Sequence, residues 1–437
     1  MTRSPLLIVM CAGYFLVLLD VTVVNVALPA IGATLGTGQA GLQWVVDGYA
    51  IAIAGLLLAG GTIGDVHGHR RVVLTGLAVF GVASLACGLA PGVGWLVAAR
   101  FAQGAGAALL LPGTLAIITE AYRDTAARAR AIGVWAGAGS AALPIGPLLG
   151  GLLVAAFGWR SVFVVNVPVV LVAAVMTARL APRGERVAGR RVDWAGAVLA
   201  TAVLTTVTVA VIAGLPWLSV LAAVLLGTFV AVERAVAEPM LPLAVFRGRA
   251  FSVANGVAGV MNLCTLGLLF LVTQYLQTVR HASAPAAGLA LLPLFLPLTL
   301  LAPYAGRVVA RSGARPPMVA GLVMAAAGFA VLTLPAADSP YWVLLPALLL
   351  WGVGLAALTP AVVAAAVGSA GARAGLASGV NNTARQAGGA VGIAIFGAVA
   401  GSASNARAFV SGMHVSSLAS ALLFLVAGLS TVLMRSN

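Results

Sequence analysis

The sequence predicts an all-α protein that crosses a membrane many times. Its 437 residues are 62% hydrophobic and 8% charged, and their mean hydropathy is +1.10. A soluble domain carries about 25% charged residues, so this chain has too few to cover a surface exposed to water. Apolar runs of about twenty residues, long enough to cross a bilayer as a helix, recur along the whole sequence. We expect fourteen such spans: residues 6–30, 43–63, 72–91, 94–119, 130–156, 160–178, 194–213, 217–233, 250–276, 286–306, 317–335, 341–366, 377–401 and 413–434.

The arginines predict the orientation of these spans. The chain has 24 basic residues, all of them arginine, and a formal net charge of +14. Most lie in loops that follow even-numbered spans or flank the two ends, and only Arg160, Arg280 and Arg407 lie in the opposite loops. By the positive-inside rule both termini are then cytoplasmic. The bias toward Ala, Gly, Val and Arg without Lys indicates a bacterial gene, so we expect a multi-pass protein of the bacterial inner membrane. We expect no nucleic-acid partner, because the basic residues are spread over short loops.

An internal repeat divides the chain into two halves. Five residues of one loop recur in a second loop at a constant offset of 245: Gly61, Gly68, Arg70, Gly76 and Leu77 are repeated as Gly306, Gly313, Arg315, Gly321 and Leu322. Each copy joins the second and third spans of a six-span unit, which is typical of transporters built from internal repeats. We predict a six-helix half over residues 1–180, a cytoplasmic linker with two extra transmembrane helices over 181–240, and a second six-helix half over 241–437.

The fifth span is unusually rich in glycine and proline. Residues 133–152 contain no ionisable group, and Pro144 and Pro147 lie inside an otherwise helical run. Such a helix is unstable in water, but neighbouring helices can support it in a bilayer, and its small residues let another backbone approach closely. The simplest interpretation is a helix-packing face. The pattern also resembles the antiporter motif of drug-exporting members of the major facilitator superfamily, through Gly133, Gly146, Pro147, Gly150 and Gly151, with Ala142 in place of one glycine.

The loop between the second and third spans resembles the cytoplasmic loop motif of the same superfamily. The matching residues are Gly61, Asp65, Gly68, Arg70 and Arg71. In the family this loop latches the two halves together, and its basic residue pairs with an acid at the end of the fourth helix, which the resemblance identifies as Glu120. Val66 and His69 replace two usual basic positions, and Ala310 replaces the acid in the second copy. We therefore expect a weaker latch, carried by the first copy.

Further motifs resemble the fourteen-span drug:proton antiporters of this superfamily. They cover residues 18–29, 44–49, 100–108, 159–168, 193–196, 275–277 and 375–392. Their order and spacing extend the resemblance over essentially the whole chain. The resemblance implies a major facilitator fold with a central cavity between two pseudo-symmetric halves. It also implies export of a hydrophobic, drug-like molecule in exchange for a proton.

Three charged residues are candidates for proton coupling. Asp20 lies near the middle of its span, where an unpaired carboxylate costs about 2.5–3.5 kcal/mol, so it needs a partner. Arg100 is the natural one, because it is the basic residue inside the first half's spans. The affinity of a carboxylate for a proton depends on its hydration and on its distance from a cation. A change in either can therefore cause Asp20 to bind or to release a proton. A static ion pair between the first and fourth helices is the simpler alternative, and Asp47 is the next candidate proton site.

Polar side chains inside apolar spans predict where a substrate binds. The thirteenth span carries polar residues at i, i+4 spacing, which places them on one face of a helix. We expect the cavity to be lined by Asn25, Gln103, Asn381, Asn382, Arg385 and Gln386. The last six spans contain no acid, since Asp338 is the only acid after Glu238 and lies in a loop. A buried dication needs more than one carboxylate, so we expect neutral or singly charged lipophilic substrates.

The sequence predicts no cofactor and no enzymatic activity. It contains nothing that resembles a nucleotide-binding loop, a metal cluster or a hydrolase triad, and Cys11, Cys87 and Cys264 fall inside apolar spans. The expected partners are a lipophilic small molecule, protons and the lipid bilayer, with a monomer as the unit. Three alternatives stay open. The same fold could export an endogenous metabolite or lipid, it could import its substrate, or the chain could be a polytopic membrane enzyme with polar residues clustered at one membrane face.

Overall fold

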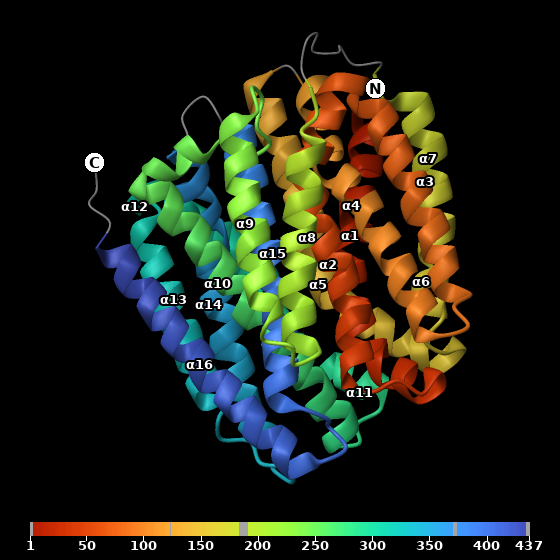
Figure 1. Ribbon diagram of the computed structural model, residues 1–437, viewed down its shortest axis with the longest axis vertical. Helices are drawn as coiled ribbons and strands as arrows, with labels where there is room; N and C mark the ends of the chain where they lie inside the picture. Colours follow the sequence, from red (N-terminus) through yellow and green to blue (C-terminus); the bar gives the residue numbers. More distant parts are fainter. Residues whose placement is uncertain (1–2, 123, 183–190, 370–373, 434–437) are drawn as a thin grey trace.

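Long helices make up the whole architecture (Figure 1). The computed structural model describes residues 3–122, 124–182, 191–369 and 374–433, and within these ranges the chain forms a helical bundle with no strand. The prediction of an all-α membrane protein is confirmed. The linker residues 183–190 and the loop 370–373, which hold several of the arginines used for the topology prediction, lie outside the described residues.

The helices follow the chain in three groups. The first group contains α1 (Arg3–Leu35), α2 (Gln39–His67), α3 (His69–Gly88), α4 (Val93–Ala121), α5 (Thr125–Phe157), α6 (Ser161–Val164) and α7 (Asn166–Leu180). The second contains α8 (Trp194–Ile212) and α9 (Leu218–Ala235). The third contains the 3₁₀ turn η1 (Leu243–Arg247), α10 (Arg249–Gln274), the π turn η2 (Tyr275–Val279), α11 (Ala284–Ala290), α12 (Leu292–Ser312), α13 (Arg315–Val331), α14 (Tyr341–Gly368), α15 (Ala374–Ala400) and α16 (Ala406–Val432).

Each of the fourteen predicted spans lies in helical structure. The sixth is divided between α6 and α7, and the tenth between α11 and α12, which are bent by 43° where they meet. Over the described ranges, eleven helices are long and apolar enough to cross a membrane, and this bent pair would make a twelfth. The 17 residues of α13 are too few for this criterion, and the polar helix α15 does not meet it either. The helix count is consistent with fourteen spans but does not match it exactly.

The internal repeat is also a repeat of contacts. Gly68 ends α2 with φ of 90°, and Gly313 ends α12 with φ of 78°, a conformation that favours glycine. Two residues later, Arg70 donates to the Ala178 carbonyl near the end of α7, and Arg315 donates to the Val432 carbonyl at the end of α16. Both arginines thus fasten the start of a third span to the end of a sixth span, as expected for two similar halves.

The two halves meet along two seams. At one seam α2 lies beside α15, where the Gln43 side-chain amide donates to the carbonyls of Ile393 (3.1 Å) and Ala394 (2.8 Å). At the other seam α5 lies against α11 and α12. Gln277 near this seam donates to the Val26 carbonyl of α1 at 2.9 Å, and Thr299 of α12 to the Ser140 carbonyl of α5 at 3.2 Å. Most of these bonds lie toward the end of the bundle opposite the start of α1, which is the predicted outer end.

The inserted helices α8 and α9 cover the α2–α15 seam (Figure 1). Gly55 of α2 leaves room for Thr201 of α8, and a Cβ atom added there would lie 2.9 Å from the Thr201 Cβ. Apolar side chains of α9 point away from the protein, with Val220 69% and Val224 59% exposed, as expected for a surface that faces lipid.

Two buried acids attach these inserted helices to the segment that follows them. Asp193 caps α8 by accepting from the Gly196 amide at 2.7 Å, and its other oxygen accepts from the Met240 amide at 3.2 Å. Glu233 of α9 accepts from the Leu241 amide at 2.8 Å. These hydrogen bonds hold the segment after α9, at Met240 and Leu241, against the start of α8 and the end of α9.

Candidate functional site

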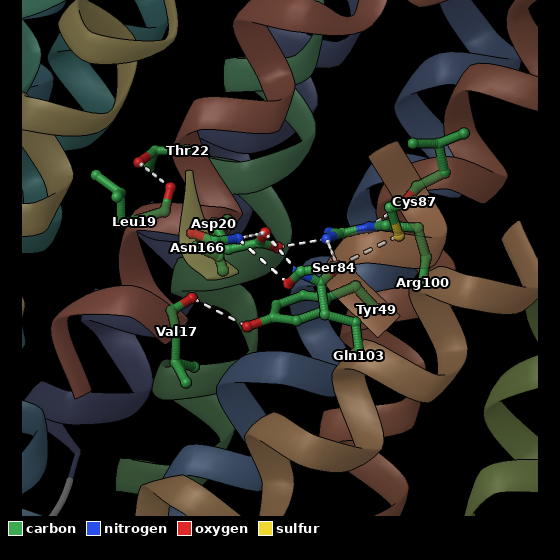
Figure 2. A network of polar contacts seen from close by, with 12 residues as sticks. Val17, Leu19, Asp20, Thr22, Tyr49, Ser84, Cys87, Arg100, Gln103 and Asn166 are labelled. Carbon is green, nitrogen blue, oxygen red and sulfur yellow. Dashed lines mark hydrogen bonds and ion pairs between the residues drawn. The ribbon is translucent and has the colours of Figure 1, made fainter. Parts of the chain in front are cut away.

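The site is a buried polar network in the first half, centred on Asp20 (Figure 2). Arg100 donates from Nη1 to Asp20 Oδ2, and both side chains are completely buried. The other carboxylate oxygen accepts from Gln103 Nε2 at 2.9 Å and from Asn166 Nδ2 at 3.4 Å. The charge of Asp20 is therefore compensated inside the bilayer region by an ion pair and two amide donors, which a buried carboxylate requires.

Arg100 is fixed from several sides. Its Nε donates to the Val45 carbonyl at 2.9 Å, and Nη1 also donates to Gln103 Oε1 at 2.6 Å. The guanidinium carbon lies 4.3 Å from the ring centroid of Tyr49 and 5.7 Å from that of Phe163, distances at which cation–π attraction contributes. The pairing of Asp20 with Arg100 that the sequence predicts is confirmed, and it joins α1 to α4.

Gln103 lies within this network and not at an open surface. It is completely buried and also donates to Ser84 Oγ at 2.9 Å, so it cannot contact a substrate in this conformation. Asn25 is also buried. Its amide donates to the Val21 carbonyl at 2.7 Å, while its Oδ1 atom has no hydrogen-bond partner among the described residues. That Gln103 and Asn25 line the cavity stays a prediction.

Asp47 lies at the boundary between the halves. It is completely buried on α2, and neither carboxylate oxygen has a hydrogen-bond partner in the described part of the chain. One turn before it Gln43 binds the α15 backbone, and one turn after it Ile51 packs against Ala390 of α15. Asp47 thus occupies the α2 face that contacts the second half.

The polar stripe of α15 is extended by α10. Asn381 Nδ2 donates to Asn255 Oδ1 at 3.4 Å, and Arg385 Nε donates to Asn262 Oδ1 at 3.4 Å. Gln386 is buried and Asn382 is half-buried. The two α10 asparagines were not among the predicted site residues. Their spacing of seven residues on an apolar span, which places them on one helix face, was the available signal.

Two aromatic residues of the first half pack against each other between α1 and α5. Tyr14 of α1 stacks on Trp135 of α5, with ring centroids 3.8 Å apart and planes at 13°. Trp135 donates from Nε1 to Thr114 Oγ1 at 3.3 Å. Tyr14 and Arg385 are electrostatic neighbours across the two halves. Neither aromatic residue was predicted as a site residue, because the sequence does not distinguish an aromatic residue at a site from one in the core of an apolar span.

The glycines of α5 allow contacts with both halves. A Cβ atom added at Gly150 would lie 2.8 Å from Val23 Cγ2 and 2.9 Å from the Val23 carbonyl of α1, and one at Gly146 would overlap Thr22. A Cβ atom at Gly151 would lie 2.6 Å from the Ala284 carbonyl of α11, and Gly288 of α11 lies directly against the Pro147 carbonyl. Gly133 differs, since nothing lies within 4 Å of its Cβ position.

The predicted latch residues make their described contacts within the first half. Asp65 pairs with His69 at 3.2 Å, and Arg70 donates to the Ala178 carbonyl. Glu120 Oε2 is buried without a hydrogen-bond partner among the described residues. Arg70 is therefore not paired with Glu120 in this conformation, and the latch stays a prediction.

Comparison with known proteins decides the family. The family model described as "Major Facilitator Superfamily" matches residues 10–265 and 256–435. The chain belongs to the major facilitator superfamily. A multidrug resistance protein, Stp of Mycobacterium tuberculosis, is 37% identical over 91% of this chain and 76% of its own length. A methylenomycin A resistance protein of Streptomyces coelicolor is 36% identical over 96% and 90%. The cephamycin export protein CmcT of Amycolatopsis lactamdurans is 38% identical over 92% and 86%.

Solved structures of other superfamily transporters have the same fold. The nucleoside transporter NupG superposes with a TM-score of 0.71 over 100% of both chains, at 12% identity. A bacterial homologue of the human lysosomal transporter Spinster gives a TM-score of 0.68 over 99% of this chain and 96% of that one, at 19% identity. The superfamily fold predicted from the sequence motifs is thereby confirmed.

Proposed function

We propose that this major facilitator protein exports hydrophobic small molecules, antibiotics among them, in exchange for protons. The names of its relatives support the substrate class, since they are resistance and export proteins for drugs and antibiotics. The observation that carries the coupling is the buried Asp20–Arg100 pair, because an exchanger of protons needs an ionisable group inside the membrane. We place the protein in the bacterial inner membrane as a monomer with both termini in the cytoplasm, following its arginine distribution.

Asp20 is our candidate for the exchanged proton. Its carboxylate is stabilised by donors from two neighbouring helices, Arg100 and Gln103 of α4 and Asn166 of α7. A movement of α1 relative to α4 that separates Asp20 from Arg100 would leave a carboxylate without its cation, and a proton would then replace the lost charge. Restoring the pair would expel the proton.

Asp47 is our candidate for a second proton position. A buried carboxylate with no donor is far less costly when it is neutral, so we propose that Asp47 is protonated while α2 and α15 are in contact. A separation of the two helices would admit water to it. The protonation state of Asp47 would in this way depend on whether α2 and α15 are in contact.

Alternating access requires the seams to open and close. Gly150 and Gly151 let α5 touch α1 and α11 at the predicted outer end, and we propose that this contact closes the outer side when substrate enters from the cytoplasm. The cytoplasmic latch is proposed to act in the opposite state, in which Arg70 or Arg71 can reach Glu120.

A second candidate function is export of an endogenous product by the same mechanism. The relatives include a cephamycin export protein and a tetracenomycin C resistance and export protein of Streptomyces glaucescens. These names do not distinguish export of an antibiotic that the cell itself makes from resistance to an external drug. The transport chemistry is the same in both cases.

Proteoliposomes test the proposed function. The purified chain is reconstituted, an outwardly directed proton gradient (acidic inside) is imposed, and uptake of radiolabelled neutral and anionic antibiotics is followed together with the internal pH. We expect uphill uptake of at least one compound and a substrate-dependent collapse of the gradient. Uptake that only equalises the concentrations, with no proton movement, would contradict proton antiport.

A further inference from the structure

The positive charge of Arg385 is not balanced by an acid in its own half. After Glu238 the sequence contains a single acid, Asp338, which lies in the loop between α13 and α14. Arg385 lies about three turns into α15, and no ion pair involves it among the described residues. The second half therefore presents an arginine inside its spans without a carboxylate to pair with.

Most donors of Arg385 are unused. A guanidinium has five N–H groups, and Arg385 makes one hydrogen bond in the described part of the chain, from Nε to Asn262. Arg100 differs, because its guanidinium donates to Asp20, Gln103 and the Val45 carbonyl. The side chain of Arg385 is half-buried, whereas that of Arg100 is completely buried.

The acids of the first half cannot neutralise Arg385. Asp20 is paired with Arg100, and Asp47 is completely buried in the α2–α15 seam. The first-half group that interacts with Arg385 is the neutral Tyr14, which stacks on Trp135. A ligand bound to Arg385 would therefore lie beside the amides of α10 and α15, with Tyr14 as its electrostatic neighbour in the first half.

We propose that Arg385 binds the anionic group of the substrate, and that the transporter prefers amphiphilic organic anions, such as aromatic carboxylates, over cations of the same shape. This inference rests on the proposed export function and specifies its substrate class. Arginine pairs with a carboxylate through two parallel N–H groups, and the terminal nitrogens of Arg385 make no hydrogen bond in the described ranges. The Tyr14–Trp135 pair accommodates the apolar body.

The charge of the substrate determines how strongly the membrane potential drives the exchange. Exchange of one inward proton for one outward anion moves two charges in the same electrical sense, whereas exchange for a neutral molecule moves one and for a cation none. A membrane potential that is negative inside therefore drives anion export more strongly than export of a neutral analogue.

Three naphthalene compounds that differ in charge test the preference: naphthylacetate, naphthylacetamide and naphthylmethyl-trimethylammonium. Binding to the purified chain in lipid nanodiscs is measured by titration calorimetry. We expect the acetate to bind at least tenfold more tightly than the ammonium compound, the size expected for one charge-assisted hydrogen bond. Equal affinities, or no measurable binding of the acetate, would overturn the proposal.

Two variants identify the residue. Arg385→Gln should lower the ratio of acetate to acetamide affinity at least tenfold, and Asn262→Asp should do the same by giving Arg385 an internal carboxylate. Arg407→Gln is the matched control, because Arg407 is an exposed arginine outside the stripe and its loss should leave the ratio unchanged. An unchanged ratio in both Arg385→Gln and Asn262→Asp would assign the preference elsewhere and refute this role of Arg385.

Binding and transport separate this inference from the proposed function. If the acetate is preferred in binding but a pH gradient drives no uptake, proton antiport is wrong and the anion site stands. If the gradient drives uptake of all three compounds equally, antiport stands and the anion site is wrong.

Discussion

At the scale of single residues, the buried acids Asp20 and Asp47 are in opposite situations. Asp20 accepts from Arg100, Gln103 and Asn166, whereas the oxygens of Asp47 have no partner among the described residues. The first acid depends on its neighbours for its charge, and the second is tolerated only when it is neutral. This difference predicts that mutations around Asp20 and at Asp47 change the free energy of unfolding by unequal amounts.

Arg100→Gln should destabilise the protein by about 3–5 kcal/mol, because it leaves the buried charge of Asp20 without its cation. Asp20→Asn/Arg100→Gln should recover most of this loss, since both charges are then removed. Asp47→Asn breaks no ion pair and should change the stability by about 0.5 kcal/mol or less. Thermal unfolding in detergent measures all three. A double variant as unstable as Arg100→Gln would mean that the two side chains are not energetically coupled.

At the scale of elements, α5 is the helix on which both halves converge. Its glycines at 146 and 150 contact α1, and the glycine at 151 contacts α11. A larger side chain at any of these positions must push a neighbouring backbone away. The consequence for transport follows from closure of the outer seam, which requires these backbones to touch.

We predict that Gly150→Leu and Gly151→Leu reduce transport at least tenfold while the protein still inserts in the membrane. Gly133→Leu is the matched control on the same helix, because no atom lies within 4 Å of its Cβ position, and it should retain transport. Efflux assays with expression measured by immunoblot distinguish the three variants. Equal transport by all of them would show that close packing at positions 150 and 151 is unnecessary.

At the scale of the whole molecule, the sequence was sufficient for the helical fold, the superfamily and the Asp20–Arg100 pair, and the division into two six-helix halves stays a prediction. Periodic apolar runs determine helices, and a lone acid in such a run requires a cation, so only a few partners were possible. The acceptor of Arg70 was not predictable, because a backbone carbonyl such as that of Ala178 leaves no mark in the sequence. The sequence also does not show how each helix is rotated about its own axis. For this reason neither the place of Gln103 in the Asp20 network nor the stacking of Tyr14 on Trp135 was predicted.

The central claim is that Asp20 carries the proton that is exchanged for substrate. The most direct test compares the wild-type chain with Asp20→Asn in proteoliposomes energised by a pH gradient alone, with Asp338→Asn, an exposed loop variant, as control. We predict that Asp20→Asn loses uphill uptake at least tenfold but still exchanges labelled for unlabelled substrate without a gradient, and that Asp338→Asn behaves like the wild type. Uphill uptake by Asp20→Asn at the wild-type rate would contradict the account.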